Sequence, residues 1–221
     1  MQSFEYYASQ ADNIDFRAEC WIDGQFVRSK SGETFENFNP ATGKKLCDVA
    51  RGNGHDVNAA VKAARAAFED GRWSRKTPGE RKEVLLNLAK LIRENITEMA
   101  LLDTLDMGKP ISETINVDAP GAAFFFQWHA EAVDKIYDEI APTGGRDIAM
   151  IRRTPLGVIG AVVPWNFPLD MATWKLAPAL ATGNSVVLKP AEQSPLSALR
   201  LAELAKEAGL PDGVLNVVPG F

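Results

Sequence analysis

The residues of this chain best suited to chemistry are an asparagine, a lysine and a glutamate at the ends of two predicted strands. Asn166 lies in a Pro-Trp-Asn-Phe-Pro turn, and Lys189 and Glu192 belong to a later Lys-Pro-Ala-Glu turn. Between two prolines that pin the backbone, the Asn166 amide can donate to an oxygen on which negative charge develops. Taken alone, such an asparagine is more often a simple turn residue, so both interpretations stay open at this point.

A regular alternation of strands and helices must position these turns. We predict strands over 157–163, 185–188 and 214–218, with helices over 169–181 and 195–208 between them. Near-continuous Val, Ile and Leu runs indicate parallel strands buried on both faces, and right-handed crossovers make the segment a βαβαβ unit. A dinucleotide binds outside the carboxyl ends of such strands, where both turns lie. The sequence therefore predicts an α/β fold with a Rossmann-like parallel sheet.

The first 140 residues must pack around this sheet. Their patterns predict edge strands over 19–27 and 34–49, helices over 56–69, 78–93 and 96–107, and a mostly helical stretch over 111–140 with a kink near Pro120-Gly121. Phe124, Phe125, Phe126 and Trp128 in that stretch are expected in the core. A further strand is predicted over 148–154.

Composition and charge exclude several classes of function. The 221 residues carry a formal net charge of −5 without a long lysine or arginine run, so no nucleic-acid partner is expected. Apolar stretches fall short of the roughly 20 residues that span a bilayer, and no signal peptide is evident, so we expect no membrane partner and a cytoplasmic location. Cys20 and Cys47 are expected to be inert thiols, and His55 and His129 lack neighbours at zinc-ligand spacing.

The segment LGVIGAVVPWNFPLDMATWKLAPALATGNSVVLKPAEQSP resembles the aldehyde dehydrogenase superfamily in both turns and in the spacing between them. No Gly-x-Gly-x-x-Gly follows the first strand, which agrees with that family. The resemblance covers nearly the whole chain and implies an incomplete fold. Residues 1–140 would be the amino-terminal helical and edge-strand part of the NAD-binding domain, 141–156 oligomerisation strands and 157–221 its first βαβαβ half. The catalytic domain is expected to be absent from this chain.

The resemblance also implies roles for individual residues. The implied reaction is NAD-dependent oxidation of an aldehyde to the acid through a cysteine thiohemiacetal, with Asn166 as oxyanion donor and with the cysteine and a glutamate base expected beyond Phe221. Glu192 would bind the adenosine ribose and repel a 2′-phosphate, so NAD is favoured over NADP. The implied cofactor-binding residues are Val163, Pro164, Trp165, Lys189 and Glu192.

Substrate choice is predicted from the helix that follows Asn166. Phe167, Asp170 and Trp174 share one helical face, which lines the aldehyde tunnel in similar enzymes, and Asp118 could approach its mouth. A carboxylate there would favour a cationic or amide-bearing tail, although Asp170 could instead be a solvated acid at a helix N-terminus. Wider similarity is closest to the polyamine-catabolism branch, whose substrates are amino-, guanidino- or γ-glutamylamino-butyraldehydes.

The resemblance implies two further features. A structural monovalent cation would be bound by Asp106, Gln193 and a carbonyl near Asn37 or Phe38, and residues 148–154 resemble oligomerisation strands of a homodimer or homotetramer. Two other functions stay open. The chain could be a catalytically silent nucleotide-binding fragment, or part of an acylating semialdehyde dehydrogenase that uses coenzyme A.

Overall fold

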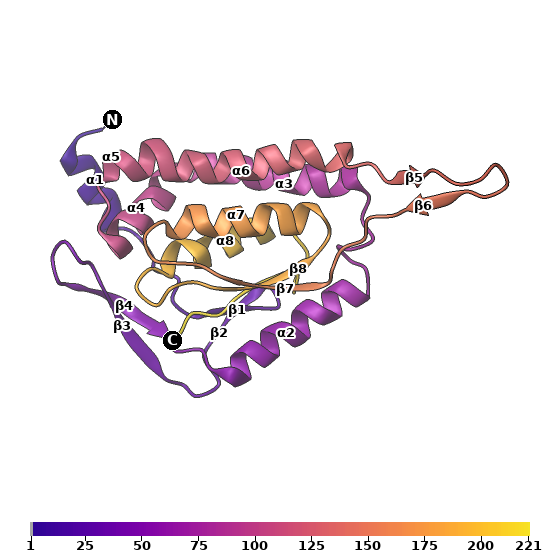
Figure 1. Cartoon of the computed structure of the whole chain (residues 1–221). Helices are drawn as coiled ribbons and strands as arrows, with labels where there is room; N and C mark the ends of the chain where they lie inside the picture. Colours follow the sequence, from indigo (N-terminus) through magenta and orange to yellow (C-terminus); the bar gives the residue numbers. More distant parts are fainter. Residues whose placement is uncertain (1) are drawn as a thin grey trace.

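A five-stranded sheet lies at the centre of the computed structural model, which describes residues 2–221 (Figure 1). The strand order is β2-β1-β9-β8-β7. β7 (Val158–Val162), β8 (Ser185–Lys189) and β9 (Leu215–Val217) run parallel, and the hairpin of β1 (Cys20–Ile22) and β2 (Gln25–Val27) extends the sheet antiparallel to β9. The predicted α/β fold and its βαβαβ unit are confirmed.

Helices cover both faces of this sheet. α2 (Gly54–Glu69) packs on one face, and α7 (Pro168–Ala181) and α8 (Leu196–Glu207) cover the other (Figure 1). α3 (Pro78–Glu94) and α6 (Ala119–Ala132) form a further layer outside α7. The parallel strands are therefore held between apolar helix faces, which leaves the loops at their carboxyl ends free to form a site.

Local signals determine where these helices begin and end. At the start of α3, Thr77 and Glu80 form the predicted capping box, in which each side chain binds the other residue's amide. α2 begins two residues earlier than expected, because Asn53 caps it and Asp56 closes a second capping box. α4 (Ile96–Met107) ends where predicted, at Gly108, whose φ of 79° lies in the left-handed region.

The predicted helix over 111–140 differs from the observed one in two ways. The irregularity lies before Pro120, in the short π-helix η1 (Thr114–Asp118) that links α5 (Ile111–Glu113) to α6 (Ala119–Ala132). Pro120 follows this π-helix, in the first turn of α6. After η2 (Val133–Lys135), the chain enters the strand β5 (Glu139–Ala141), so the expectation of helix to residue 140 was wrong.

The core position expected for four aromatic residues of α6 is correct for Phe126, partly correct for Phe125 and wrong for the other two. Phe126 is fully buried, whereas Phe124 and Trp128 are 55% and 54% exposed. Phe125 is half-buried and packs edge-on against Trp174, with ring centroids 5.3 Å apart. Successive helical residues point about 100° apart, so residues so close in sequence cannot all face the same core.

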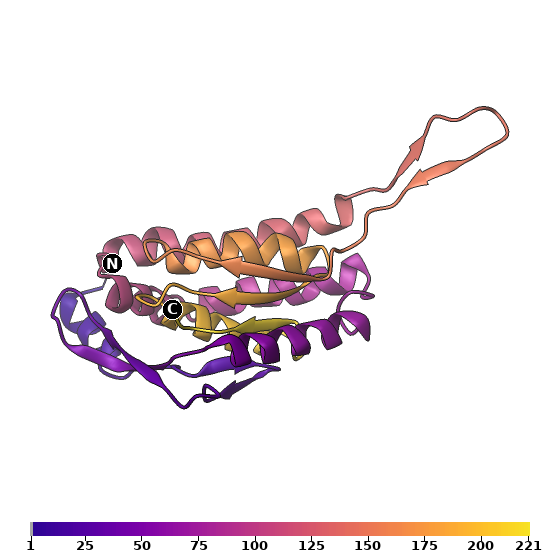
Figure 2. The same ribbon diagram turned by 60° about the horizontal axis from the view of Figure 1, so that its bottom comes forward.

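Three other segments lie outside the central sheet. β3 (Thr34–Phe38) and β4 (Lys45–Ala50) form a separate two-stranded ribbon, and α1 (Phe4–Ala11) is a short helix that the sequence patterns did not predict. β5 and β6 (Ala149–Ile151) form a hairpin that projects away from the body of the molecule (Figure 2). Within residues 2–221, no helix combines the length and apolarity needed to cross a membrane.

Burial of the parallel strands is uneven. β8 is buried along almost its whole length, and β9 is buried throughout. β7 lies at the edge of the sheet and exposes Gly160 and Val162, which departs from the expected burial on both faces. An edge strand has a neighbour on one side only, so part of its surface stays uncovered.

Candidate functional site

The turn around Asn166 and the turn from Lys189 to Glu192 lie side by side at the carboxyl ends of β7 and β8. Val162 pairs with Lys189 in the parallel register, and the Val163 amide donates to the Lys189 carbonyl at 3.1 Å. The Ser194 hydroxyl, just beyond the second turn, donates to the Trp165 carbonyl at 3.2 Å. Sheet register and one side-chain bond therefore join segments more than twenty residues apart.

Asn166 is an exposed residue between Pro164 and Pro168. Within residues 2–221, no protein group forms a hydrogen bond with its side-chain amide, so both N–H donors are free. α7 begins at Pro168, two residues after Asn166, and its N-cap residue Phe167 forms no side-chain cap. A free amide beside a helix N-terminus suits the stabilisation of a developing negative charge.

The residues predicted to hold a dinucleotide lie at the same carboxyl ends of β7 and β8. Lys189 is half-buried, and among residues 2–221 its ammonium donates only to the adjacent Pro190 carbonyl, at 3.2 Å. Glu192 is half-buried, and no ion pair with it occurs in the described part of the chain. Both side chains can therefore bind ribose hydroxyls without first breaking an ion pair, so the residues present fit a nucleotide.

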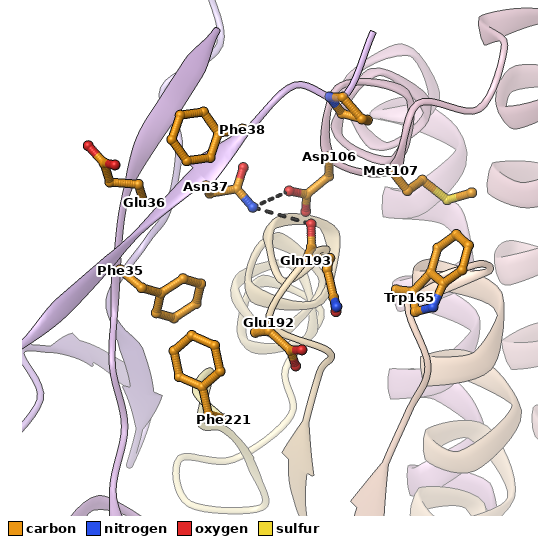
Figure 3. Close-up of a pocket in the computed structure, with 11 residues that line it drawn as sticks. Phe35, Glu36, Asn37, Phe38, Asp106, Met107, Trp165, Glu192, Gln193 and Phe221 are labelled. Carbon is orange, nitrogen blue, oxygen red and sulfur yellow. Dashed lines mark hydrogen bonds between the residues drawn. The ribbon is translucent and has the colours of Figure 1, made fainter. Parts of the chain in front are cut away.

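A pocket of about 500 Å³ brings two groups of predicted residues together (Figure 3). Trp165 and Glu192 from the nucleotide turns line it with Asn37, Asp106 and Gln193 from the implied cation site. β3, the end of α4 and the loop after β8 supply the second group. Tertiary packing thus unites residues that are up to 156 positions apart in the sequence.

Asn37 connects the three residues of the implied cation site. Its Nδ2 donates to Asp106 Oδ1 at 2.7 Å and to the Gln193 carbonyl at 3.3 Å, while its buried Oδ1 has no partner. Asp106 Oδ2 accepts from the Leu196 amide at 2.8 Å, yet burial raises the pKa of Asp106 well above its usual value. Residues 2–221 contain no group of three or more His, Cys, Asp or Glu that could hold a metal ion.

The three residues predicted to face a tunnel lie at the N-cap and in the first half of α7. Phe167 and Trp174 are 41% and 51% exposed, and Asp170 lies half-buried between them. Asp170 Oδ1 has no hydrogen-bond partner, and a Cβ added at Gly121 would lie only 3.1 Å from it. Burial, reinforced by the negative charge of Asp118, raises the pKa of Asp170 to about 7. Asp170 is therefore not the fully solvated acid of the alternative interpretation.

Asp118 is bound by a lysine that the sequence patterns did not single out. Only 1% of Asp118 is exposed, and Lys109 Nζ lies 2.8 and 2.7 Å from its two carboxylate oxygens. The same ammonium lies 3.9 Å from the centre of the Phe167 ring. The Asp118 carboxylate is therefore paired with Lys109 and is not free. The Gly-Lys-Pro sequence immediately after a predicted helix end was the signal that could have identified Lys109.

Asp103 is a second unpredicted acid of this region. Its carboxyl is fully buried without a hydrogen bond of ordinary geometry, although Ser197 and the Leu169 amide face it and partly stabilise its charge. Burial nevertheless raises the pKa of Asp103 to about 7. Its place on the inner face of α4 carried no signal in the sequence beyond helical periodicity.

Neither cysteine is suited to nucleophilic attack. Both are free thiols, with Cys20 buried and Cys47 half-buried. Burial raises the pKa of each thiol to about 12, so both remain protonated near neutral pH. This agrees with the interpretation of both residues as inert thiols.

Comparison with known proteins identifies one family and several similar enzymes. The aldehyde dehydrogenase family model matches residues 26–221. NADP/NAD-dependent aldehyde dehydrogenase PuuC of Escherichia coli is 53% identical over 98% of this chain and 44% of its own length. Aminoacetaldehyde dehydrogenase of Pseudomonas aeruginosa is 52% identical over 99% of this chain, again 44% of its own length.

A solved γ-glutamyl-γ-aminobutyraldehyde dehydrogenase from Burkholderia cenocepacia superimposes with a TM-score of 0.98 and 50% identity. The match covers 99% of this chain and 44% of that one. The chain thus spans less than half the length of each of these three relatives. The family match and the shared fold lead to one conclusion: this chain belongs to the aldehyde dehydrogenase family.

Proposed function

We propose that the full-length protein containing this chain oxidises an aldehyde to the carboxylic acid with NAD as the hydride acceptor. The proposal depends on one observation. The turn that holds the free Asn166 amide and the turn that holds Lys189 and Glu192 lie next to each other at the carboxyl ends of β7 and β8. Because the pKa values of Cys20 and Cys47 are both about 12, the nucleophilic cysteine is proposed to come from outside these 221 residues.

In the proposed reaction, Asn166 donates a hydrogen bond to the oxyanion that forms when a thiolate attacks the carbonyl carbon. Pro164 and Pro168 restrict the backbone on both sides of Asn166, which limits the reorganisation needed when charge develops. Lys189 and Glu192 bind ribose hydroxyls, and the backbone of Val163 to Trp165 lies along the nicotinamide. The bound dinucleotide supplies the acceptor for the hydride.

The direct test is aldehyde-dependent formation of NADH by the purified full-length protein, followed at 340 nm. We expect turnover with an aldehyde and none with the corresponding alcohol. Binding of NAD without oxidation of any aldehyde tested would instead support a silent nucleotide-binding protein. Turnover that requires coenzyme A would support the acylating alternative.

Glu192 is expected to determine the preference for NAD over NADP. Replacing Glu192 with serine removes a carboxylate that would repel a 2′-phosphate. The ratio of kcat/KM with NAD to kcat/KM with NADP should therefore fall about tenfold, equivalent to roughly 1.4 kcal/mol. The measurement is kcat/KM with each cofactor at saturating aldehyde. Glu94→Ser, which alters an exposed glutamate at the end of α3, serves as the control. The same cofactor ratio in Glu192→Ser and wild type would exclude this role.

The proposed substrate is an aldehyde with a cationic or amide-bearing tail. Asp170 supports this proposal, since its carboxyl oxygen is unpartnered and lies on the helical face that follows Asn166. Two relatives carry an amine or an amide in the names of their substrates, aminoacetaldehyde and γ-glutamyl-γ-aminobutyraldehyde. Asp118 is proposed to act through Lys109 rather than by contact with the tail.

A monovalent cation beside Asn37, Asp106 and Gln193 stays part of the proposal. Two observations support it, the unpartnered Asn37 Oδ1 and the buried Asp106 carboxyl. A cation would give the Asn37 oxygen a partner and would compensate the charge of the buried Asp106 carboxylate. A cytoplasmic location likewise stays a prediction.

We propose that the β5–β6 hairpin joins subunits in a homodimer or homotetramer. Ile140, Ile148 and Met150 are 76%, 81% and 77% exposed, and an isolated hairpin is marginally stable in water. Ile140→Lys with Met150→Lys should shift the full-length protein to smaller species at micromolar concentration in light scattering. Val57→Lys, on the distant helix α2, should not. A wild-type protein that is active and strictly monomeric would exclude the assembly.

A further inference from the structure

Lys109 is held in place by its neighbours in the sequence. Gly108 ends α4 in the left-handed conformation, and Pro110 immediately precedes α5. The φ angle of a proline is restricted, and the glycine conformation closes the preceding helix, so the backbone around Lys109 has little freedom. Only 16% of the Lys109 side chain is exposed. Its ammonium is therefore directed into the protein rather than into solvent.

The Lys109 ammonium lies between a carboxylate and an aromatic ring. Asp118 holds it from one side through both oxygens, at 2.8 and 2.7 Å. The Phe167 ring contacts it from the other, with 3.9 Å between Nζ and the ring centroid. A cation this close to an aromatic face is attracted to it, more strongly where water is excluded. Lys109 thus links the buried Asp118 to the first residue after Asn166.

Two hydrogen bonds to backbone carbonyls hold the exposed turn around Asn166. Trp165, Asn166 and Phe167 are all exposed, and the Asn166 side chain has no hydrogen bond within the described residues 2–221. The backbone is tied by Ser194 at the Trp165 carbonyl and by the Met171 amide at the Phe167 carbonyl, at 2.9 Å. The contact with Lys109 restrains a side chain of the turn directly beside the proposed oxyanion donor.

We propose that Lys109 is a positioning residue, which holds the Phe167 ring and thereby fixes the orientation of the Asn166 amide. This inference rests on the proposed function of Asn166. An oxyanion donor must lie within about 2.7–3.1 Å of the position that the oxyanion will occupy, and small misplacements lower rates strongly. Because the oxyanion exists only along the reaction, loss of Lys109 reduces kcat more than it changes KM.

The experiment compares four variants of the full-length protein with wild type, using propanal, an uncharged substrate that no tunnel charge attracts. Lys109→Met alone would leave Asp118 buried and unpaired, so it is combined with Asp118→Asn in a neutral variant. Lys109→Arg keeps a cation that can contact both partners, and Phe167→Leu removes the ring while leaving the ion pair. The fourth variant combines Phe167→Leu with the neutral variant. Lys90→Met, at an exposed lysine of α3, is the matched control.

We expect kcat of the neutral variant and of Phe167→Leu to fall about 3-fold to 30-fold, with KM within about threefold of wild type. Lys109→Arg should recover most of the lost kcat. The combined variant should be no slower than the slower of its two parents, because both remove one interaction. Three outcomes would each overturn the proposal. The first is a loss of kcat in the combined variant equal to the product of the losses in its two parents. The others are a loss of kcat in Lys109→Arg as large as in the neutral variant, and an unchanged kcat in the neutral variant.

Hydrogen exchange of the peptide covering residues 164–171 gives a readout independent of activity. Exchange should be faster in the neutral variant and in Phe167→Leu, and close to wild type in Lys109→Arg and Lys90→Met. Faster exchange in a protein that oxidises no aldehyde would refute the proposed function while supporting the link between Lys109 and the turn. An active protein with unchanged exchange and unchanged kcat in the neutral variant would refute the role of Lys109 alone.

Discussion

Replacing Asn166 with alanine in the full-length protein is expected to lower kcat about 100-fold or more, with little change in the affinity for NAD. The amide makes no hydrogen bond within residues 2–221, so its removal breaks no observed side-chain bond in this structure. The lost interaction forms mainly with the oxyanion, and removal of one such donor costs about 100-fold to 1,000-fold in kcat. Steady-state kinetics with a saturating aldehyde, together with NAD titration, measure both quantities.

Asn166→Asp separates donation from side-chain size. Aspartate has nearly the shape of asparagine but cannot donate when ionised, so its kcat should be at least as low as that of Asn166→Ala. Asn58→Ala, at an exposed position of α2 on the far face of the sheet, should match wild type. If Asn166→Ala stays within about threefold of wild type in kcat, Asn166 is a turn residue and not the oxyanion donor.

Replacing Asp170 with asparagine is expected to lower the preference for a cationic over an apolar aldehyde about tenfold or more. At an effective dielectric near 20, an ion pair of this kind is worth on the order of a few kcal/mol before desolvation. The tail contact exists equally in ground and transition states, so the loss should appear mainly in KM. The measurement is the ratio of kcat/KM for 4-guanidinobutyraldehyde to that for hexanal.

The same preference should depend on pH. The pKa of Asp170 is raised to about 7, first by burial and then by the charge of Asp118, while Lys109 opposes the shift. The buried Asp103 lies close enough for its own pKa to be raised in part by Asp118 and Asp170. The carboxylate is ionised above pH 7 and neutral below it, so the preference for the cationic aldehyde should fall from pH 8 to pH 6. In Asp170→Asn it should vary little over this range.

Asp212→Asn is the control for both measurements, because Asp212 is an exposed residue paired with Lys206 just before the amino end of β9. It should retain the wild-type preference at each pH. A wild-type substrate ratio in Asp170→Asn would show that the Asp170 carboxyl does not contact the tail. Substrate choice would then have to depend on other residues.

The sequence by itself determined the elements whose signals lie within a few residues. The Thr77–Glu80 capping box, the stop at Gly108 and the apolar runs of β7, β8 and β9 were predicted close to their observed bounds. The two chemical turns were found in the same way, since prolines and strand ends mark them. These features depend on backbone preferences and on neighbours along the chain, which are visible in the printed residues.

Only the tertiary structure decided which side chains face each other across elements. It placed Lys109 between Asp118 and Phe167, buried Asp103 without a hydrogen bond of ordinary geometry, and left Phe124 and Trp128 exposed. It also began strand β5 at Glu139, where the end of a helix was expected. Contacts of this kind depend on distances between segments remote in sequence, and burial then changes the pKa of an acid such as Asp170 far more than its immediate neighbours along the chain would indicate.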